Sequence, residues 1–195
     1  EIASCLVGSE MCIRDRPNMT VVMPADYYAA RKLVRAAADY EGPVYLRFTR
    51  DAVPLIYNED STFKIGKANK LRDGRDVAII ANGDTLRLAV QAADMLAEAG
   101  VDARILDMHT IKPLDQEAVL DCIENIGRIV TVEDHNIMNG LGSAVCEMAA
   151  EAGRGIVRRI GIQDQFGMSA PYERLLAING VTAESIAAAA LAMMK

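Results

Sequence analysis

The strongest constraint on the fold is a regular alternation of short apolar runs with helix-forming segments, from Asp76 to the C-terminus. The runs are rich in Val, Ile, Leu and Ala, as expected of strands that are buried on both faces. They lie at residues 77–81, 103–106, 128–132 and 156–160. Strands of this kind that alternate with helices predict the α/β fold class, with a mainly parallel sheet and helices on both faces.

Capping residues predict where the intervening helices begin and end. Asp84 is expected to cap a helix that runs to about Ala99, where Gly100 would end it. Asp115 is expected to cap a helix that runs to about Ile126. Further helices are predicted from residue 142 or 143 to about 152, at 171–177 and at 183–194.

A partial strand–helix–strand unit precedes this array. Residues 20–23 and 44–48 have the composition of strands, and Asp26 can cap a helix over residues 27–40. Residues 51–75 are polar and irregular and are predicted to form a linker with at most short strands. The chain is thus divided into residues 17–50, 51–75 and 76–195.

Residues 1–16 show neither helical nor strand periodicity. The string SCLVGSEMCIRDR within them resembles translated sequencing-adapter read-through. We interpret residues 1–16 as a non-native leader and expect them to contribute nothing to the fold. The alternative is an ordinary leader or the remnant of a strand.

The composition disfavours several classes of partner. A net charge of −6 argues against a nucleic-acid or anionic-membrane surface, because both need clustered Lys and Arg. An uninterrupted apolar run of about 18 residues, which would predict a transmembrane helix, is absent. The four Cys lack CxxC spacing, and Cys122 and Cys146 lie in apolar helical patterns. Buried free thiols fit a reducing compartment, so we expect a cytoplasmic location.

Candidate functional residues follow the predicted strands, since ligands of open α/β sheets bind beyond the carboxyl ends of strands. Arg47 and Arg50 lie at the end of the predicted strand at 44–48, and each offers a planar fork for phosphate or carboxylate. Alternation along the strand predicts that the two arginines point to opposite faces. The alternative role for each is a surface salt bridge.

A second group follows the predicted strand at 128–132. Glu133, Asp134 and His135 have the residue types for acid–base chemistry, and Gly140 and Gly142 could expose backbone N–H groups to an anion. The alternative is that His135 orders this loop by hydrogen bonds. We therefore treat His135 as a candidate for a structural or interface role.

Three further polar residues carry weaker signals. Asp84 belongs to a strand-to-helix turn, and His109 lies at a strand exit without an assigned role. Asp164 could bind a metal, but no second carboxylate lies nearby at ligand spacing, so we expect it to fix its loop or an interface. Since the GxSxG and GxxxxGK[ST] motifs are also missing, the residues by themselves predict no complete active site.

Taken in order, several segments resemble the transketolase family. They are residues 17–26 (PNMTVVMPAD), 42–50 (GPVYLRFTR), 106–115 (LDMHTIKPLD), 131–143 (TVEDHNIMNGLGS) and 164–169 (DQFGMS). The resemblance covers residues 17–195 and is closest to the C-terminal subunit of split transketolases. It implies an incomplete pyrimidine-binding domain at 17–50 and a C-terminal domain at 76–195. Asn139 and Ala170 depart from the family, which usually has glycine at both positions.

The resemblance also implies an activity and its requirements. The intact assembly would transfer a two-carbon ketol unit between sugar phosphates, as in the pentose phosphate pathway, with thiamine diphosphate and Mg²⁺. A thiamine-diphosphate-binding N-terminal subunit or domain would be the partner, in a homodimer or heterotetramer. The family's activating glutamate and its GDG…N motif have no match in this sequence. Arg50 alone is carried over, because it matches an arginine that contacts the sugar-phosphate substrate.

Other interpretations remain open from the sequence. Within the same superfamily, the chain could be part of a 1-deoxy-D-xylulose-5-phosphate synthase or of a 2-oxo-acid dehydrogenase beta subunit. A non-enzymatic alternative is a C-terminal domain that acts in dimerisation or regulation. Residues 109–113 (HTIKP) together with residues 164–169 favour transketolase.

The missing family motifs predict that this chain alone binds no cofactor or metal and has no catalytic activity. Titration calorimetry of the isolated chain with thiamine diphosphate and Mg²⁺ is expected to show no binding heat, because the activating carboxylate and the diphosphate motif are not in this sequence. Micromolar affinity would contradict this prediction.

Overall fold

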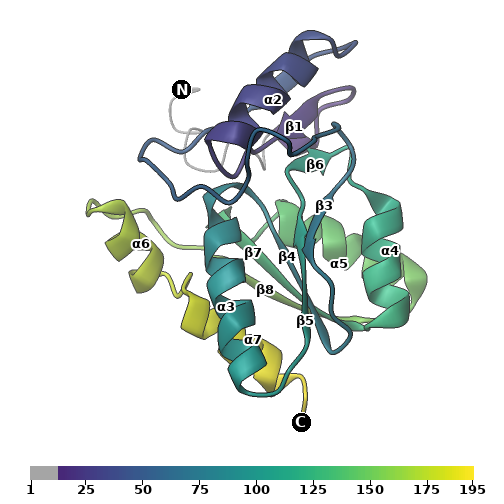
Figure 1. Cartoon of the computed structure of the whole chain (residues 1–195), viewed down its shortest axis with the longest axis vertical. Helices are drawn as coiled ribbons and strands as arrows, with labels where there is room; N and C mark the ends of the chain where they lie inside the picture. The colour runs from purple at the N-terminus through teal and green to yellow at the C-terminus, as the bar shows by residue number, and fades with distance from the viewer. Residues whose placement is uncertain (1–12) are drawn as a thin grey trace.

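A five-stranded sheet forms the centre of the molecule (Figure 1). The computed structural model describes residues 13–195. The strands are, in spatial order, β3 (Asn69–Arg72), β5 (Ala103–Asp107), β4 (Val77–Ala81), β7 (Arg128–Asn136) and β8 (Ile156–Ile162). Neighbours from β5 to β8 pair in parallel, and β3 alone joins antiparallel, to β5. The predicted mainly parallel sheet is confirmed.

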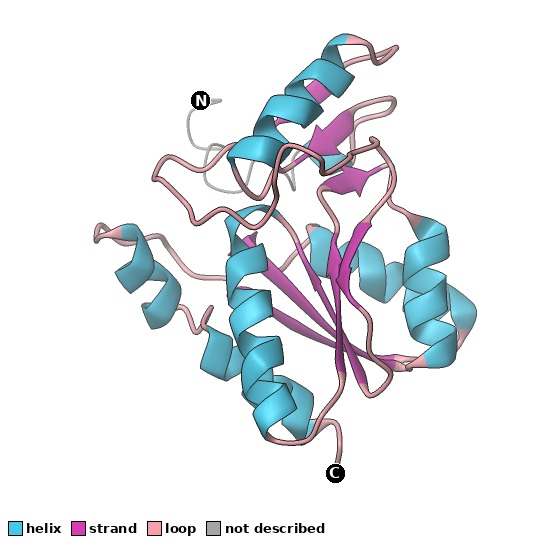
Figure 2. Cartoon of the chain, viewed as in Figure 1, coloured by secondary structure: helices cyan, strands magenta, loops and turns pink. Residues whose placement is uncertain are grey.

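Helices cover both faces of this sheet, as Figure 2 shows. On one face lie α3 (Leu86–Glu98) and α7 (Ala183–Ala192), and on the other α4 (Gln116–Asn125) and α5 (Leu141–Ala152). Strand β4 shows why its sequence is apolar throughout. Ile79 packs in the core with α3 and α7, whereas its neighbour Ile80 packs in the core with α4 and α5. Both are fully buried, because successive side chains of a strand point to opposite faces.

A second, three-stranded sheet lies at the carboxyl ends of the parallel strands (Figure 1). β1 (Thr20–Val22) pairs in parallel with β2 (Val44–Leu46) and antiparallel with β6 (Thr110–Lys112). Helix α2 (Tyr27–Ala38) covers it with the buried side chains of Ala29 and Leu33. The two sheets meet closely, since the Gly83 amide after β4 donates to the Met23 carbonyl at 3.3 Å. We call residues 17–50 the N-terminal unit, and the five-stranded sheet with its helices and β6 the large unit.

Strand β6 was not predicted. The segment Thr110–Lys112 is short, and its pairing partner β1 lies far away in sequence. A three-residue run carries no usable periodicity, so its pairing is decided in space. β3 is a short strand of the kind allowed for in the predicted linker, but its position and its pairing with β5 were not predicted.

Two predicted helix caps are confirmed and one is wrong. The Asp26 carboxylate accepts from the Ala29 amide at 2.9 Å, and that of Asp115 from the Ala118 amide at 3.3 Å. Asp84 does not cap α3, because a 3₁₀ turn, η2 (Gly83–Thr85), separates β4 from the helix. Its carboxylate instead lies 2.9 Å from the hydroxyl of Tyr172, at the start of α6 (Tyr172–Ile178).

Residues 13–16 contact the rest of the fold, contrary to the expectation for residues 1–16. Ile13 packs against the core of the three-stranded sheet, with Val21 and Ile111. The Lys112 ammonium donates to the carbonyls of Arg14 at 2.9 Å and Arg16 at 2.6 Å. Such contacts need only an apolar side chain and backbone carbonyls, so they do not depend on helical or strand periodicity. The rest of this segment lies outside the described residues.

The cysteines differ in burial. Cys122 is buried in α4, as predicted, and burial raises the pKa of its thiol. Cys146 in α5 is half-buried. The remaining two, Cys5 and Cys12, lie outside the described residues.

The segment Tyr172–Ala192 meets the length and composition criteria for crossing a membrane, with a mean hydropathy of 1.6. In the structure it forms two helices, α6 and α7, separated by a turn that contains Gly180 with a φ of 71°. Ile186 of α7 is fully buried in the core with α3. Each of the two helices is shorter than the roughly 20 residues that a membrane-spanning helix needs.

The docking of β3 onto β5 makes Gly74 a sensitive position. A Cβ atom there would lie closer than 3.0 Å to the backbone of Ala103 and Arg104, which cannot rotate away. Gly74→Ala is therefore expected to lower the free energy of unfolding by about 1–3 kcal/mol in urea denaturation. Gly167→Ala is the matched control, because a Cβ there would meet nothing within 4 Å. Equal stability of the two variants would show that β3 tolerates displacement from the sheet.

Candidate functional site

A cavity of about 650 Å³ lies where the N-terminal unit meets the large sheet. One wall is the segment that follows β2, residues 47–54. The opposite wall comes from η2, the start of α3, β7 and α6. The cavity is therefore beyond the carboxyl ends of β4 and β7, where open α/β sheets bind their ligands. Its charged lining residues are Arg47, Arg50, Asp51, Asp84, Arg87, Asp134 and Glu173.

Arg47 and Arg50 both line this cavity, so the prediction that they point to opposite faces is wrong. The physical reason is that β2 ends at Leu46, and strand alternation does not extend past it. The Arg47 guanidinium donates to the Asp134 carboxylate. The Arg50 side chain is exposed and makes no hydrogen bond or ion pair within residues 13–195.

Asp134 is the buried anion of the cavity. Its side chain is 4% exposed, and its second oxygen accepts from the Tyr172 hydroxyl at 3.0 Å. Burial by itself would raise the pKa of this carboxyl, but Arg47, His135 and the Tyr172 hydroxyl outweigh it and hold the pKa below its ordinary value. Asp134 is therefore ionised at neutral pH. It lies within β7 rather than after it, because the strand continues to Asn136.

The Tyr172 hydroxyl also lies 2.9 Å from the Asp84 carboxylate. A hydroxyl has one proton to donate and cannot serve two carboxylates fully. Burial, together with the charge of Asp134, raises the pKa of Asp84 to about 6. A protonated Asp84 can donate to Tyr172, which then donates to Asp134, so that the shared hydroxyl accepts one hydrogen bond and donates the other. Burial and the two carboxylates raise the pKa of Tyr172, which stays protonated.

The group around Glu133 and His135 is packed against the start of α5. The fully buried Glu133 carboxylate accepts from the Gly142 amide at 3.1 Å, and its other oxygen lies 3.4 Å from His135 Nδ1. Burial raises the pKa of Glu133. A Cβ at Gly142 would lie 2.7 Å from this carboxylate, which explains a glycine there. Because Glu133 already occupies the helix N-terminus, the arrangement supports a structural role for His135 rather than binding of an external anion.

Asp164 lies in an exposed loop, away from the cavity. Its carboxylate has no partner within residues 13–195, so its interface role stays a prediction. Phe166 in the same loop is 99% exposed. Across residues 13–195, no three His, Cys, Asp or Glu side chains gather in a way that could hold a metal ion.

His109 and Asp107 connect the linker to the large sheet, a role that sequence reasoning missed. Asp107 ends β5 and accepts from the Tyr57 hydroxyl at 2.7 Å, and burial raises the pKa of Asp107 to about 7. His109 is fully buried against the ring of Phe63, and burial lowers its pKa to about 4. Both positions lie at the end of β5 or just after it. A polar residue at the end of a strand was the only signal in the sequence. The partners of these two residues, Tyr57 and Phe63, lie in the linker, whose sequence shows no periodicity.

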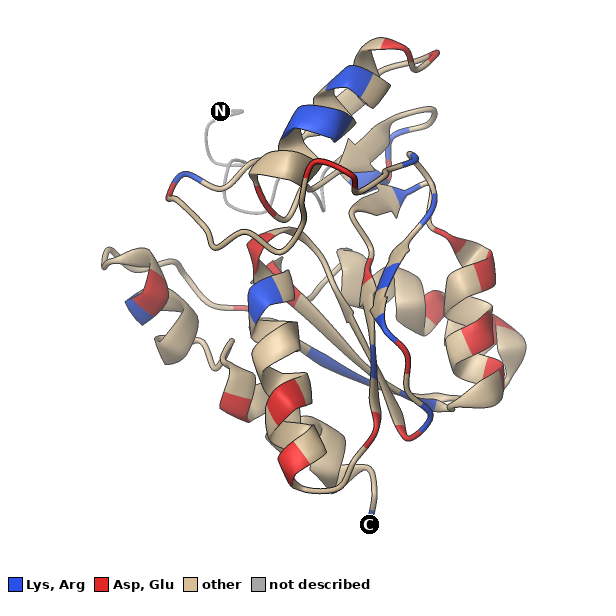
Figure 3. Ribbon diagram, in the orientation of Figure 1, with Lys and Arg blue, Asp and Glu red and all other residues tan. Residues whose placement is uncertain are grey.

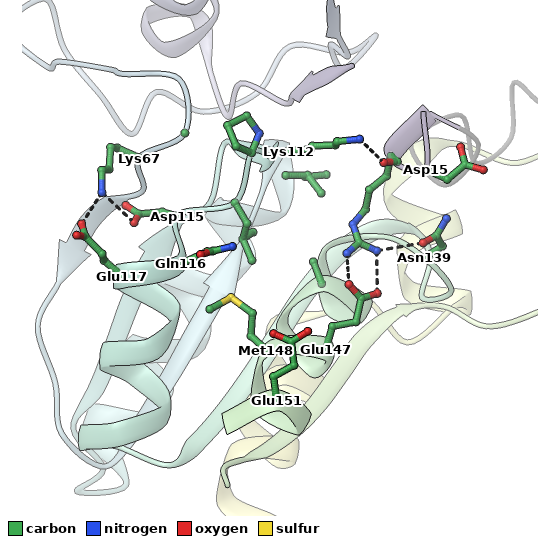
Figure 4. Close-up of a pocket in the computed structure, with 16 residues that line it drawn as sticks. Asp15, Lys67, Lys112, Asp115, Gln116, Glu117, Asn139, Glu147, Met148 and Glu151 are labelled. Carbon is green, nitrogen blue, oxygen red and sulfur yellow. Dashed lines mark hydrogen bonds and ion pairs between the residues drawn. The ribbon is translucent and has the colours of Figure 1, made fainter. Parts of the chain in front are cut away.

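A second, more open cavity of about 770 Å³ lies between α4, α5 and the segment from β6 to the start of α4 (Figure 4). Two of its three described lining cations are paired with carboxylates, and the third, Lys112, donates to the carbonyls of Arg14 and Arg16. Lys67 lies 3.4 Å from Asp115 and 2.5 Å from Glu117, and Arg14 pairs with Glu147. Since these side chains neutralise one another, the second cavity is less suited to an anionic ligand than the cavity that contains Arg50.

The position of Asp84 generates a pH-dependence. Its folded-state pKa of about 6 exceeds the ordinary 3.8, so its contribution to stability is complete below about 3.8 and is lost as the pH rises through about 6. Asp84→Asn keeps a donor towards Tyr172 at every pH. It is expected to raise the free energy of unfolding at pH 7 by about 1–3 kcal/mol and to lose most of this gain at pH 4. Urea denaturation at both pH values measures it. A gain that is independent of pH would contradict a raised pKa.

Comparisons with known proteins agree with this architecture. Residues 66–186 match the family model for the transketolase C-terminal domain, and residues 7–55 match that for the transketolase pyrimidine-binding domain. Among solved structures, the chain superposes on one described as a split gene transketolase, inactive beta4 tetramer. The TM-score is 0.92 at 38% identity, over 95% of this chain and 61% of that chain.

Curated relatives have related names. A subunit of apulose-4-phosphate transketolase from Phocaeicola vulgatus is 45% identical over 184 residues, which are 94% of this chain and 59% of the relative. The 1-deoxy-D-xylulose-5-phosphate synthase of Thermomicrobium roseum is 41% identical over 187 residues, 93% of this chain and 30% of the relative. The chain thus spans about three fifths of the transketolase subunit and less of the synthase. The resemblance seen in the sequence is confirmed: this chain belongs to the transketolase family.

Proposed function

We propose that this chain is the C-terminal part of a transketolase-type transferase, which moves a two-carbon ketol unit between sugar phosphates. The observation that carries the proposal is the unpaired Arg50 in the cavity beyond β4 and β7. Arg47 pairs with Asp134, and Arg87 pairs with Glu173 at 2.6 Å. Among the described arginines of the lining, Arg50 is therefore the cation left for a ligand.

The chemistry of the cavity fits a sugar phosphate. A guanidinium presents a planar fork of donors that matches a phosphate dianion. A volume of about 650 Å³ lies within the range of roughly 300–1,000 Å³ typical of small-molecule sites. The neighbouring carboxylate of Asp51 and the backbone of the 47–54 segment supply acceptors and donors for sugar hydroxyls. Recognition of a phosphate would give Arg50 a partner in this cavity.

Thiamine diphosphate and Mg²⁺ belong to the proposed activity, but the described residues do not form their site. A Mg²⁺–diphosphate site needs clustered oxygen ligands, and residues 13–195 bring no such acidic cluster together. We therefore assign the cofactor to a different part of the assembly. The role of this chain is then to bind the phosphate end of the substrate.

The partner follows from the same proposal. The chain covers only 59% of a relative that is itself named as one subunit of a transketolase, and a similar solved structure is named a beta4 tetramer. We propose that it acts in the cytoplasm with a thiamine-diphosphate-binding N-terminal subunit or domain, as a homodimer or heterotetramer. On this proposal, the chain needs that partner for turnover.

A second candidate function is the synthesis of 1-deoxy-D-xylulose 5-phosphate. The identity of 41% to a synthase from Thermomicrobium roseum favours it specifically. Both reactions use phosphorylated sugars, so Arg50 would have the same role in each. Assay of the assembled enzyme with pyruvate and with a ketose phosphate as donor would separate them.

In the assembled enzyme, Arg50→Ala is expected to weaken the binding of phosphorylated substrates about 10- to 150-fold. The substitution removes charged hydrogen bonds worth about 1.5–3 kcal/mol. Ground and transition states share the phosphate contact, so the change should appear mainly in KM. Arg50→Lys should recover part of the loss, since an ammonium lacks the planar fork. Steady-state kinetics with phosphorylated and unphosphorylated substrates measures this.

Arg75→Ala is the control, because Arg75 is exposed and lies outside the cavity lining. It removes the same side chain and should leave both KM values unchanged. An equal loss on phosphorylated and unphosphorylated substrates for Arg50→Ala would assign Arg50 a structural role instead.

A further inference from the structure

The segment that carries Arg50 is held by residues from other elements. It has no helix or strand of its own between Leu46 and Asn69. Its first residue, Arg47, is anchored twice: its amide donates to the Val22 carbonyl at 2.9 Å, and its guanidinium donates to Asp134. Asp134 belongs to β7 of the large sheet, so this second anchor crosses from one unit to the other.

The Asp134 end of this anchor is rigid. Asp134 is 4% exposed and lies in β7 between Val132, which pairs with β4 and β8, and Asn136, which pairs with β8. Tyr172 fixes the carboxylate from α6, and Asp84 contacts the same hydroxyl from η2. Arg47 is 29% exposed, so its ion pair is partly shielded from solvent and from salt screening. A charge-assisted hydrogen bond in such a place has a defined geometry.

We propose that Asp134 and Tyr172 are positioning residues for substrate binding, which hold Arg50 at the cavity through the Arg47 side chain. The inference rests on the proposed phosphate-binding role of Arg50 and adds that residues of the C-terminal domain set its affinity. Only three peptide units separate Arg47 from Arg50, so loss of the guanidinium anchor would give the segment that carries Arg50 more freedom to move. Displacement of a bidentate donor by about 1 Å loses much of its binding energy.

The proposal predicts a change in phosphate affinity that is opposite to the change expected from charge alone. Replacement of Asp134 by Asn removes a negative charge, and simple Coulomb attraction would then increase the affinity for phosphate. Loss of the Asp134 charge would also leave the positive charge of Arg47 less neutralised and act in the same direction. If Asp134 positions Arg50, the affinity falls instead. The direction of the change therefore separates positioning from electrostatics.

The test uses the 195-residue chain labelled with ¹⁵N-arginine, titrated with inorganic phosphate at pH 7.5 and followed by the Nε–H signal of Arg50 in NMR spectra. Asp134→Asn is expected to lower the phosphate affinity about tenfold, and Tyr172→Phe about fivefold, since the latter deletes one hydrogen bond to Asp134. Tyr172→Phe keeps the ion pair and the ring, so it remains informative if Asp134→Asn does not fold. In the assembled enzyme, the same variants should raise KM for phosphorylated substrates and leave kcat unchanged.

Asp94→Asn is the matched control. It removes the same charge and breaks the 2.5 Å ion pair with Arg72, away from the cavity. Its phosphate affinity should equal that of the unmodified chain. Unchanged or increased affinity in both Asp134→Asn and Tyr172→Phe, while Arg50→Ala abolishes binding, would overturn the positioning role and leave the phosphate site intact. Binding that survives Arg50→Ala, or no binding by the unmodified chain, would overturn the phosphate site itself.

Discussion

The pairing of β6 with β1 is the interaction on which the arrangement of the whole molecule depends. β6 follows β5 of the large sheet within a few residues, yet it pairs with a strand of the N-terminal unit. Three-residue strands have little stability of their own, and a two-stranded pair is marginal in water. By adding a third strand from the large unit, the chain completes the small sheet and fixes it against the carboxyl ends of β4 and β7. The cavity with Arg50 exists because of this placement.

Buried charge at this junction follows from the same geometry. The large sheet is apolar on both faces, so its polar groups gather where strands end. Asp134, Asp84 and Tyr172 meet there and are covered by the segment after β2. An ionised carboxylate in such a place needs a cation and hydrogen-bond donors, because desolvation is costly. Arg47 and Tyr172 supply them, which ties the stability of the junction to the shape of the site.

The surface charges show a division between the two units (Figure 3). Basic residues lie along α2 of the N-terminal unit, and acidic residues lie along α4 at the large sheet. On α2, Arg31 pairs with the carboxylate of Glu59 in the linker at 2.8 Å. Exposed pairs of this kind contribute little to stability, on the order of 0–1 kcal/mol each. They orient the linker, whereas the buried Arg47–Asp134 pair acts at the cavity.

The sequence by itself determined the α/β class, the helices on both faces and the capping roles of Asp26 and Asp115. These features are local: strand composition follows from burial on both faces, and a cap needs only its own first turn. The sequence also singled out Arg50, His135 and Asp164, but it could not say which residues share a site. Only the tertiary structure decided that Arg47 joins Asp134, that Asp84 contacts Tyr172 rather than capping α3, and that β6 pairs with β1. Each of these contacts links residues that are far apart in the chain. Burial and charge pairing in the folded structure select such partners. Local residue patterns do not reveal them, because these patterns report only on neighbours in the sequence.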